Sequence, residues 1–300
     1  MSRKAWLLFG AMCVIWGLPY LLIRVSVHTV TPAFLVFMRT AIGACLLLPF
    51  AIWRRQLRAV LPFWLPLVAY TLVEIAIPWV LLSEAERTIT SSLSGLLIAA
   101  VPLVGTVIAR ASGAQERLSR FQMVGLLVGL LGVAGVLGFD VGGMTFGAGL
   151  EMVVVIVCYA AGPQILARRL SHLPGPSVVA CSLTLAAIAY LPIALIQRPE
   201  AWPPGKVVAS IAILGVVCTA AGFIIFFHLI RQIGPVRSTV VTYVNPAVAV
   251  LLGVAVLHEH FTVGTAVGFA LILCGSAFAT RGRRSPKPGL KQPVPASAEP

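Results

Sequence analysis

The chain has 300 residues, of which 59% are hydrophobic and only 10% are charged, and its formal net charge is +13. A soluble domain usually carries about 25% charged residues, so this composition excludes an ordinary water-soluble globular protein. The six cysteines lie within apolar stretches and form no CxxC pair, which indicates packing residues rather than a disulfide framework or a zinc site.

Apolar runs long enough to cross a membrane follow one another along the chain, since a spanning helix needs about 20 apolar residues. They predict an all-α polytopic membrane protein with ten transmembrane helices, near 5–24, 32–52, 62–83, 88–109, 119–138, 146–167, 175–196, 206–230, 237–257 and 262–280. The first run continues past Trp16 without a clear cleavage site, so we expect a retained span rather than a signal peptide. Residues 281–300 are rich in Pro, Lys and Arg and are predicted to form a disordered tail.

The basic residues predict the orientation, because cytoplasmic loops are enriched in Lys and Arg. With the N-terminus in the cytoplasm, ten spans return the C-terminus there as well. Seventeen Lys and Arg residues then lie inside, and only Arg24, Arg87, Arg198 and Lys206 lie outside. This asymmetry accounts for the net charge through the lipid bilayer and without a nucleic-acid partner.

A three-point pattern recurs in the two halves of the chain, as a proline within a span, a glutamate at the following turn and a glycine in the next span. The residues are Pro102, Glu116 and Gly125 in the first copy and Pro246, Glu259 and Gly268 in the second. On the predicted topology one glutamate is cytoplasmic and the other external, which indicates two inverted five-helix repeats, 1–143 and 144–280. Inverted repeats are frequent in secondary transporters, whose substrate site lies between the halves.

These residues, together with Trp16-Gly17 and Arg39, resemble the paired EamA domains of the drug/metabolite transporter superfamily over about residues 5–280. The resemblance implies a ten-helix carrier, commonly an exporter of metabolites, amino acids or drugs in the bacterial inner membrane. It also implies that four helices of each half surround a central cavity while the fifth is peripheral. The chain departs from the pattern in an extra residue before Glu116, in the histidines flanking Glu259, and in lacking a second-half counterpart of Arg39.

Two ionisable residues are expected at similar depth on adjacent helices, where charge is costly and usually faces the protein interior. Arg39 is roughly 11 Å and Glu74 roughly 14 Å from the outer ends of their spans, at the helical rise. We therefore hypothesise an ion pair between them. Two interpretations are open: the charges tie helices together, or Glu74 is protonated or contacts substrate during transport.

Other polar and aromatic side chains interrupt the apolar spans. The further substrate-cavity candidates are Trp16, Tyr20, Tyr159, Gln164, Tyr243 and Asn245. Serines near the outer end of the fourth span, Ser91, Ser92 and Ser94, serve either the cavity or helix packing. The helix-kink candidates are Pro102, Pro163 and Pro246, because proline lacks a backbone donor.

Glycine stripes occur on the fifth and tenth predicted spans, at Gly125, Gly129, Gly132 and Gly135 and at Gly264 and Gly268. Small residues allow close helix approach, either within a monomer or in a homodimer.

The alternatives are a membrane-embedded enzyme, a non-transporting scaffold and a channel. The sequence has no P-loop, no GxSxG motif and no HExxH motif, so we expect no catalytic residues, no metal and no cofactor. The favoured prediction is a secondary transporter of small molecules, an exporter that works by alternating access.

Overall fold

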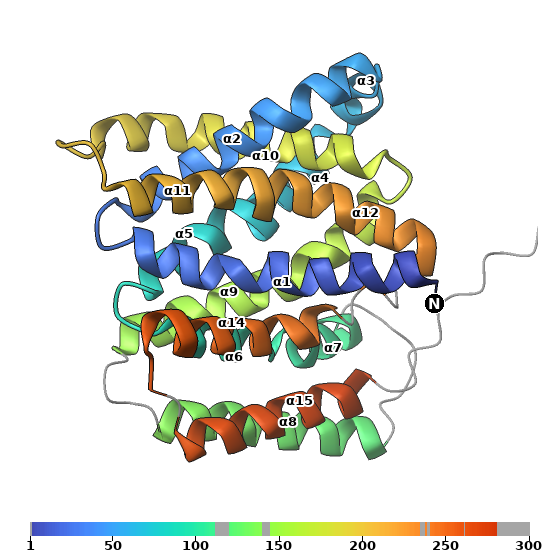
Figure 1. Ribbon diagram of the computed structural model, residues 1–300. Coiled ribbons are helices and arrows are strands. Elements are labelled where there is room, and N and C mark those ends of the chain that lie inside the picture. The colour runs from blue at the N-terminus through green and yellow to red at the C-terminus, as the bar shows by residue number, and fades with distance from the viewer. Residues whose placement is uncertain are drawn as a thin grey trace, which may run out of the picture.

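The fold is a bundle of helices that run roughly side by side (Figure 1). The computed structural model describes residues 2–111, 120–139, 145–234, 238, 241–260 and 262–280, and all regular structure in these ranges is helical. Glu116 and the 281–300 tail lie outside the described residues.

The first half of the chain contains α1 (Arg3–Ser26), α2 (Pro32–Trp53), α3 (Leu57–Val60), η1 (Leu61–Phe63), α4 (Trp64–Tyr70), η2 (Thr71–Ala76), α5 (Ile77–Ala85), α6 (Ser91–Ile98), α7 (Val101–Ala111) and α8 (Arg120–Phe139). The second half contains α9 (Phe146–Ile165), η3 (Leu166–Leu170), α10 (Gly175–Ile196), α11 (Gly205–Ile213), η4 (Leu214–Ala221), α12 (Gly222–Ile233), α14 (Val241–Leu257) and α15 (Val263–Thr280).

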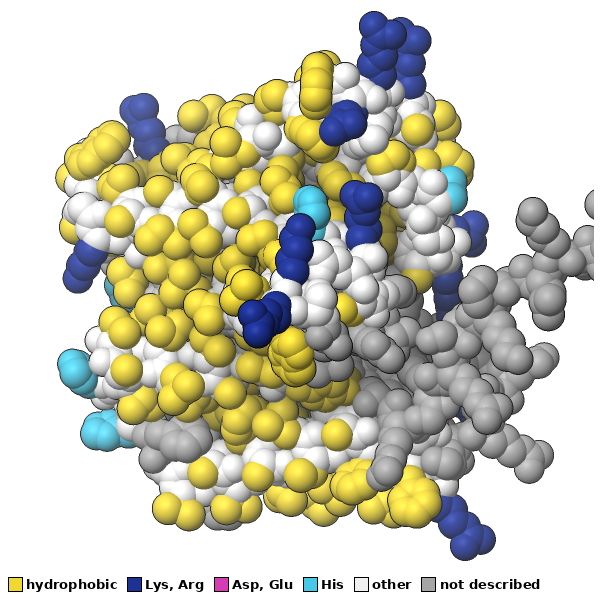
Figure 2. All heavy atoms as spheres, turned by 45° about the vertical axis from the view of Figure 1, so that its right-hand side comes forward, with side chains coloured by type: hydrophobic (Ala, Val, Ile, Leu, Met, Phe, Trp, Pro, Cys, Tyr) yellow, Lys and Arg dark blue, Asp and Glu magenta, His cyan; other side chains and the backbone are white. Residues whose placement is uncertain are grey.

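Seven helical segments are long and apolar enough to cross a membrane. They are 3–26, 32–53, 57–85, 91–108, 146–170, 175–196 and 205–233, and shorter apolar helices cover 120–135, 241–257 and 263–278. Figure 2 shows hydrophobic side chains spread over the surface, with no acidic side chain visible among the described residues of that face. Exposed apolar surface on this scale is typical of contact with lipid.

Hydroxyl caps set the start of several spans. Ser2 Oγ accepts a hydrogen bond from Ala5 N at 3.1 Å, and Thr31 Oγ1 accepts one from Phe34 N at 3.4 Å, with Pro32 as the first residue of α2. Such caps satisfy backbone donors that have no partner within the helix. These caps explain why α1 and α2 begin within two residues of the predicted starts of their spans, residues 5 and 32.

The helix-kink candidates behave differently from one another. Pro102 lies at a break, because α6 ends at Ile98 and α7 begins at Val101. Pro163 and Pro246 lie inside α9 and α14, which continue past them. The helical register also changes in the π-helical segments η2, η3 and η4, which contain no proline themselves.

The glycine stripe on α8 packs against α15, beside the rest of the bundle (Figure 1). An ideal Cβ added at Gly132 would approach Ile272 N to 2.7 Å and Gly268 O to 2.8 Å, and one at Gly275 would meet the backbone of Gly129. The stripe therefore serves packing within one chain, the first of the two uses that the sequence allows.

We call the two ends of the bundle the Arg24 end and the Arg54 end, after an arginine at each. The Arg24 end holds the turns 27–31, 86–90 and 258–260, at the left of Figure 1, and the Arg54 end holds 54–56 and 171–174. The largest buried apolar cluster lies toward the Arg24 end and joins α1, α2, α5, α6, α9 and α11. The remaining core consists of three smaller clusters.

Candidate substrate site around Arg39

Arg39 is a buried cation in the middle of the bundle, only 8% exposed. Its Nε donates a hydrogen bond to Thr219 Oγ1 at 2.9 Å. Its guanidinium carbon lies 3.6 Å from the centre of the Trp79 ring, within cation–π range. Arg39 thereby joins α2 to α5 and to η4.

The π-helical register of η4 helps to place Thr219. The Thr219 hydroxyl donates to Leu214 O, five residues earlier, at 2.8 Å while accepting from Arg39. Short π-helical segments within α-helices are frequent at functional sites, and η4 is an eight-residue example of π-helical structure. The sequence predicts no such segment, because its apolar residues fit an uninterrupted α-helix equally well.

Aromatic and sulfur side chains complete the surroundings of Arg39. Tyr20 of α1, Tyr159 of α9 and Cys218 of η4 all lie within electrostatic range of the guanidinium. Tyr20 and Tyr159, predicted to line a cavity, are thus brought together with Arg39. The group draws on helices from both halves of the chain.

The ion pair hypothesised between Arg39 and Glu74 is wrong. Among the described residues the salt bridge that forms is Arg87–Glu84, at 3.0 Å and exposed. Glu74 packs against Gly162 of α9, where an added Cβ would collide with its carboxyl group. Glu74 Oε2 is buried without a hydrogen-bond partner in the described part of the chain.

Tyr159 lies within electrostatic range of both Arg39 and Glu74. The two charged residues therefore belong to one buried polar region although they do not touch. The separation leaves Arg39 with a hydroxyl and an aromatic ring as its partners, rather than a carboxylate.

Trp16 packs against the second half of the chain. Its ring lies 4.6 Å from Phe226 and 5.9 Å from Phe223, centre to centre, with an edge-to-face geometry at Phe223. Both phenylalanines belong to α12. Trp16 is partly buried.

Three other candidates make contacts away from Arg39. The side-chain amide of Asn245, oriented to satisfy its neighbours, donates to Val241 O at 2.9 Å and Cys13 O at 3.3 Å, which joins α14 to α1. Tyr243 donates to Ser276 O of α15 at 3.4 Å, and Gln164 donates to Ala160 O of its own helix at 3.0 Å. Their part in a cavity stays a prediction.

The serines of the fourth span bind a glutamate from the other half of the chain. Glu259 accepts hydrogen bonds from the backbone N and hydroxyl groups of both Ser91 and Ser92, at the start of α6. His258 and His260 are exposed. In the described part of the chain no group of three or more His, Cys, Asp or Glu side chains forms a metal site.

Glu86 is the buried ionisable residue that the sequence reasoning missed. It follows α5 directly and is completely buried, whereas Glu84 and Arg87 beside it are exposed. The sequence holds no signal that separates the three, since all lie in the short turn between the predicted spans 62–83 and 88–109.

Comparison with known proteins decides the family. The sequence matches the EamA-like transporter family over residues 3–138 and again over 148–281. The chain belongs to the EamA-like transporter family. It is therefore a multi-pass membrane transporter, as the Trp16, Arg39 and Pro–Glu–Gly resemblance predicts.

Several relatives match nearly the whole chain. An uncharacterized inner membrane transporter, YedA of Escherichia coli (strain K12), is 25% identical over 286 residues, which cover 92% of this chain and 91% of the relative. An uncharacterized transporter of Archaeoglobus fulgidus is 24% identical and covers 93% of this chain and 100% of its own length. A crystal structure matches with a TM-score of 0.66 at 23% identity, covering 93% of this chain and 97% of that one, which supports the fold.

Proposed function

We propose that this EamA-like protein is a secondary transporter that exports small amphipathic solutes across the bacterial inner membrane by alternating access. In this proposal ten spans form two inverted repeats, 1–143 and 144–280, and both termini are cytoplasmic. The two separate family matches support this division. So do the π-helical segments η2 and η4, each within the third helical span of its repeat.

The observation that carries the proposal is the unpaired charge of Arg39. Burying a cation is costly unless hydrogen bonds and an opposite charge compensate. Thr219 supplies one acceptor and Trp79 a π face, but no carboxylate contacts the guanidinium among the described residues. An anionic group on the solute supplies the missing counter-charge, and Tyr20 and Tyr159 offer aromatic surface for an apolar part. Metabolites, amino acids and drug-like molecules include such solutes.

Counterflow in proteoliposomes tests the proposal. A panel of labelled metabolites with one carboxylate is offered to vesicles that contain the same solute unlabelled. A carrier exchanges label, whereas a channel, a membrane-embedded enzyme or a scaffold shows no counterflow.

Arg39→Gln is the variant that tests the site, and Arg54→Gln is its matched control. Arg54 also lies over a tryptophan, 5.0 Å from the Trp53 ring centre, but both residues are exposed. We expect the Arg39 variant to lose exchange and the Arg54 variant to keep it. Equal exchange in both variants overturns the assignment of the substrate site.

A further inference from the structure

Glu86 has a carboxyl group for which transport around Arg39 supplies no role. Its exposed fraction is 0%, and neither carboxyl oxygen has a hydrogen-bond partner among the described residues. The Ser94 hydroxyl lies beside it but donates to Thr90 O at 3.2 Å. A buried polar group without partners is rare and requires an explanation.

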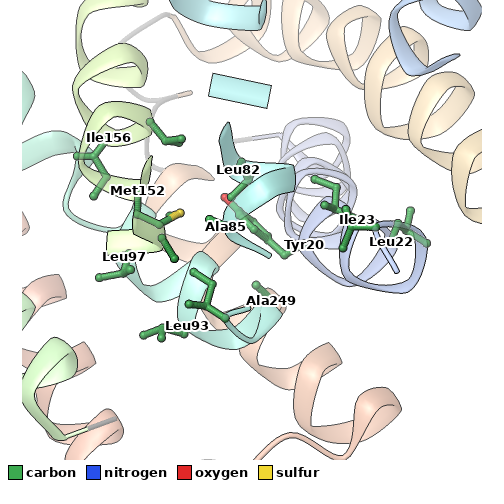
Figure 3. Close-up of a cluster of buried hydrophobic side chains, with 14 of the residues drawn as sticks. Tyr20, Leu22, Ile23, Leu82, Ala85, Leu93, Leu97, Met152, Ile156 and Ala249 are labelled. Atoms are coloured by element: carbon green, nitrogen blue, oxygen red, sulfur yellow. The ribbon is translucent and has the colours of Figure 1, made fainter. Parts of the chain in front are cut away.

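The Glu86 side chain is buried next to Ala85, a member of the largest apolar cluster. Figure 3 shows Tyr20 reaching from α1 toward Leu82 and Ala85, the residue immediately before Glu86. Leu93 and Leu97 of α6 belong to the same buried cluster. The Glu86 carboxyl is therefore enclosed where these helices meet.

The charged and titratable groups around Glu86 come from several elements. Arg24 and Tyr20 approach from α1, Tyr159 from α9, and Glu259 from the turn after α14. Arg24 Nη1 donates to the backbone carbonyl of Glu86 rather than to its carboxyl group. No cation thus neutralises the carboxylate by direct contact within the described residues.

Glu86 does not line the solvent-accessible depression at the Arg24 end, but two of its charged neighbours do. This open depression of about 460 Å³ is lined by residues that include Arg24, His28, Thr90, Lys206 and Glu259. Arg24 and Glu259 are the two charged groups of this lining that interact with Glu86. Separation of α1 from α5 and α6 would join the depression to the Glu86 carboxyl.

We propose that Glu86 is a proton-binding site that links closure of the Arg24 end to pH, with a protonated Glu86 in the closed state and an ionised Glu86 in the open state. The proposal rests on the proposed alternating-access function, in which the Arg24 end opens outward. Its ligand is the proton, and Glu86 is not part of the solute-binding group at Arg39, although Tyr20 and Tyr159 interact with both residues.

The electrostatics of the site agree with this assignment. Glu86 is the first residue after its span, and burial raises the pKa of its carboxyl well above the ordinary value of 4.5. The Ser94 hydroxyl and Arg24 lower this pKa and Glu259 raises it, each by less than burial does. Opening to water removes the effect of burial, so the open state releases the proton.

His28 does not account for a response above neutral pH. It is exposed in the same turn region, and partial burial, Arg24 and Arg87 lower the pKa of its imidazole below 6.5. The His28 imidazole therefore changes its charge below neutral pH.

Hydrogen–deuterium exchange of the purified full-length protein tests the proposal without any solute. Uptake is measured in segments 20–36 and 82–96 between about pH 6 and about pH 9, a range that reaches the pKa values of buried glutamates. We expect the wild type to show more opening at high pH, by up to about tenfold per pH unit. Exchange of every amide speeds up with pH because it is base-catalysed, so the excess that matters is the uptake beyond this general rise. We expect Glu86→Gln, which mimics the protonated carboxyl, to lack this excess.

Glu84→Gln is the matched control, because Glu84 is exposed on the same helix and pairs with Arg87. It is expected to behave as the wild type. Glu86→Asp keeps a carboxyl group and is expected to keep the excess, which guards against a Gln variant that fails to fold. A wild type without the excess, or a Glu86→Gln variant that retains it, overturns the proposal. Since no solute is present, failure of counterflow and failure of the proton site are distinguishable.

Discussion

Glu259 Oε1 accepts two hydrogen bonds from Ser91, one from its backbone N at 2.8 Å and one from its hydroxyl at 2.9 Å. Oε2 accepts two more from Ser92, at 2.9 and 2.5 Å. The carboxylate thus caps α6, where unsatisfied backbone N–H groups and the helix dipole favour an anion. One side chain fixes the turn after α14 to the start of a helix in the other half.

Glu259→Gln is expected to lower stability. The amide NH₂ of the introduced glutamine would face the backbone N and hydroxyl of Ser92, which donate to the carboxylate in the wild type. An unsatisfied buried donor costs about 2 kcal/mol, which corresponds to a fall in apparent melting temperature of about 4–8 °C. Thermal unfolding of the detergent-solubilised protein, monitored by fluorescence, measures the fall. The exposed Glu84→Gln variant is expected to melt as the wild type, and equal melting of the two variants would contradict the capping role.

Thr219→Val is expected to reduce transport by removing the acceptor for Arg39 Nε. The valine has nearly the same shape, so the buried donor is left unsatisfied at a cost near 1.4 kcal/mol, or about tenfold in exchange rate. The matched control is Thr184→Val, because the Thr184 hydroxyl donates only to Ala180 O of its own helix, at 2.8 Å. Counterflow with equal protein levels compares them, and a Thr219 variant as active as the Thr184 variant refutes the prediction.

The sequence predicts helix positions well because lipid imposes both length and apolar character on a span. It also predicts that Arg39 and Glu74 lie deep, since the helical rise converts residue number into depth. It does not predict their partners, because depth says nothing about direction around the helix. Arg39 faces Trp79 and Thr219, whereas Glu74 faces Gly162.

The same limit explains why residues next to one another in sequence have different roles. Asn245 contacts α1 through Cys13, whereas Tyr243, two residues earlier, contacts α15. Successive residues of a helix turn by about 100°, so two positions apart face different neighbours. Glu86 and its exposed neighbours Glu84 and Arg87 differ in the same way.

Gly162→Ala is expected to displace the Glu74 carboxyl, because the new Cβ would occupy the space of Oε2 and lie 3.0 Å from Glu74 Cδ. Overpacking of this kind costs about 1–3 kcal/mol. If Glu74 takes part in transport, exchange falls in this variant as it does in Glu74→Gln. Gly10→Ala is the control, since nothing lies within 4 Å of its added Cβ. Unchanged exchange in both the Gly162 and Glu74 variants assigns Glu74 to helix packing alone.

Gly275→Ala is expected to loosen the contact between α15 and α8 without changing solute affinity. Its Cβ would meet backbone atoms of Gly129 and Gly125, which cannot move aside as a side chain can. We expect a destabilisation of about 1–3 kcal/mol with an unchanged half-saturating solute concentration. Gly205→Ala, with nothing within 4 Å, is the control. A large change in half-saturation would place this helix pair in the solute pathway.

Glu86→Gln is expected to remove a pH-dependent component of stability. A buried carboxyl with a raised pKa binds its proton more tightly in the folded state than in the unfolded state. Its contribution is fully present below the ordinary value of 4.5 and is lost as pH rises toward the raised pKa. The wild type should therefore melt at progressively lower temperature than Glu86→Gln as the pH rises through this window, and the slope is limited to about 1.4 kcal/mol per pH unit. Parallel melting curves across the range would show that Glu86 is ionised inside the folded protein.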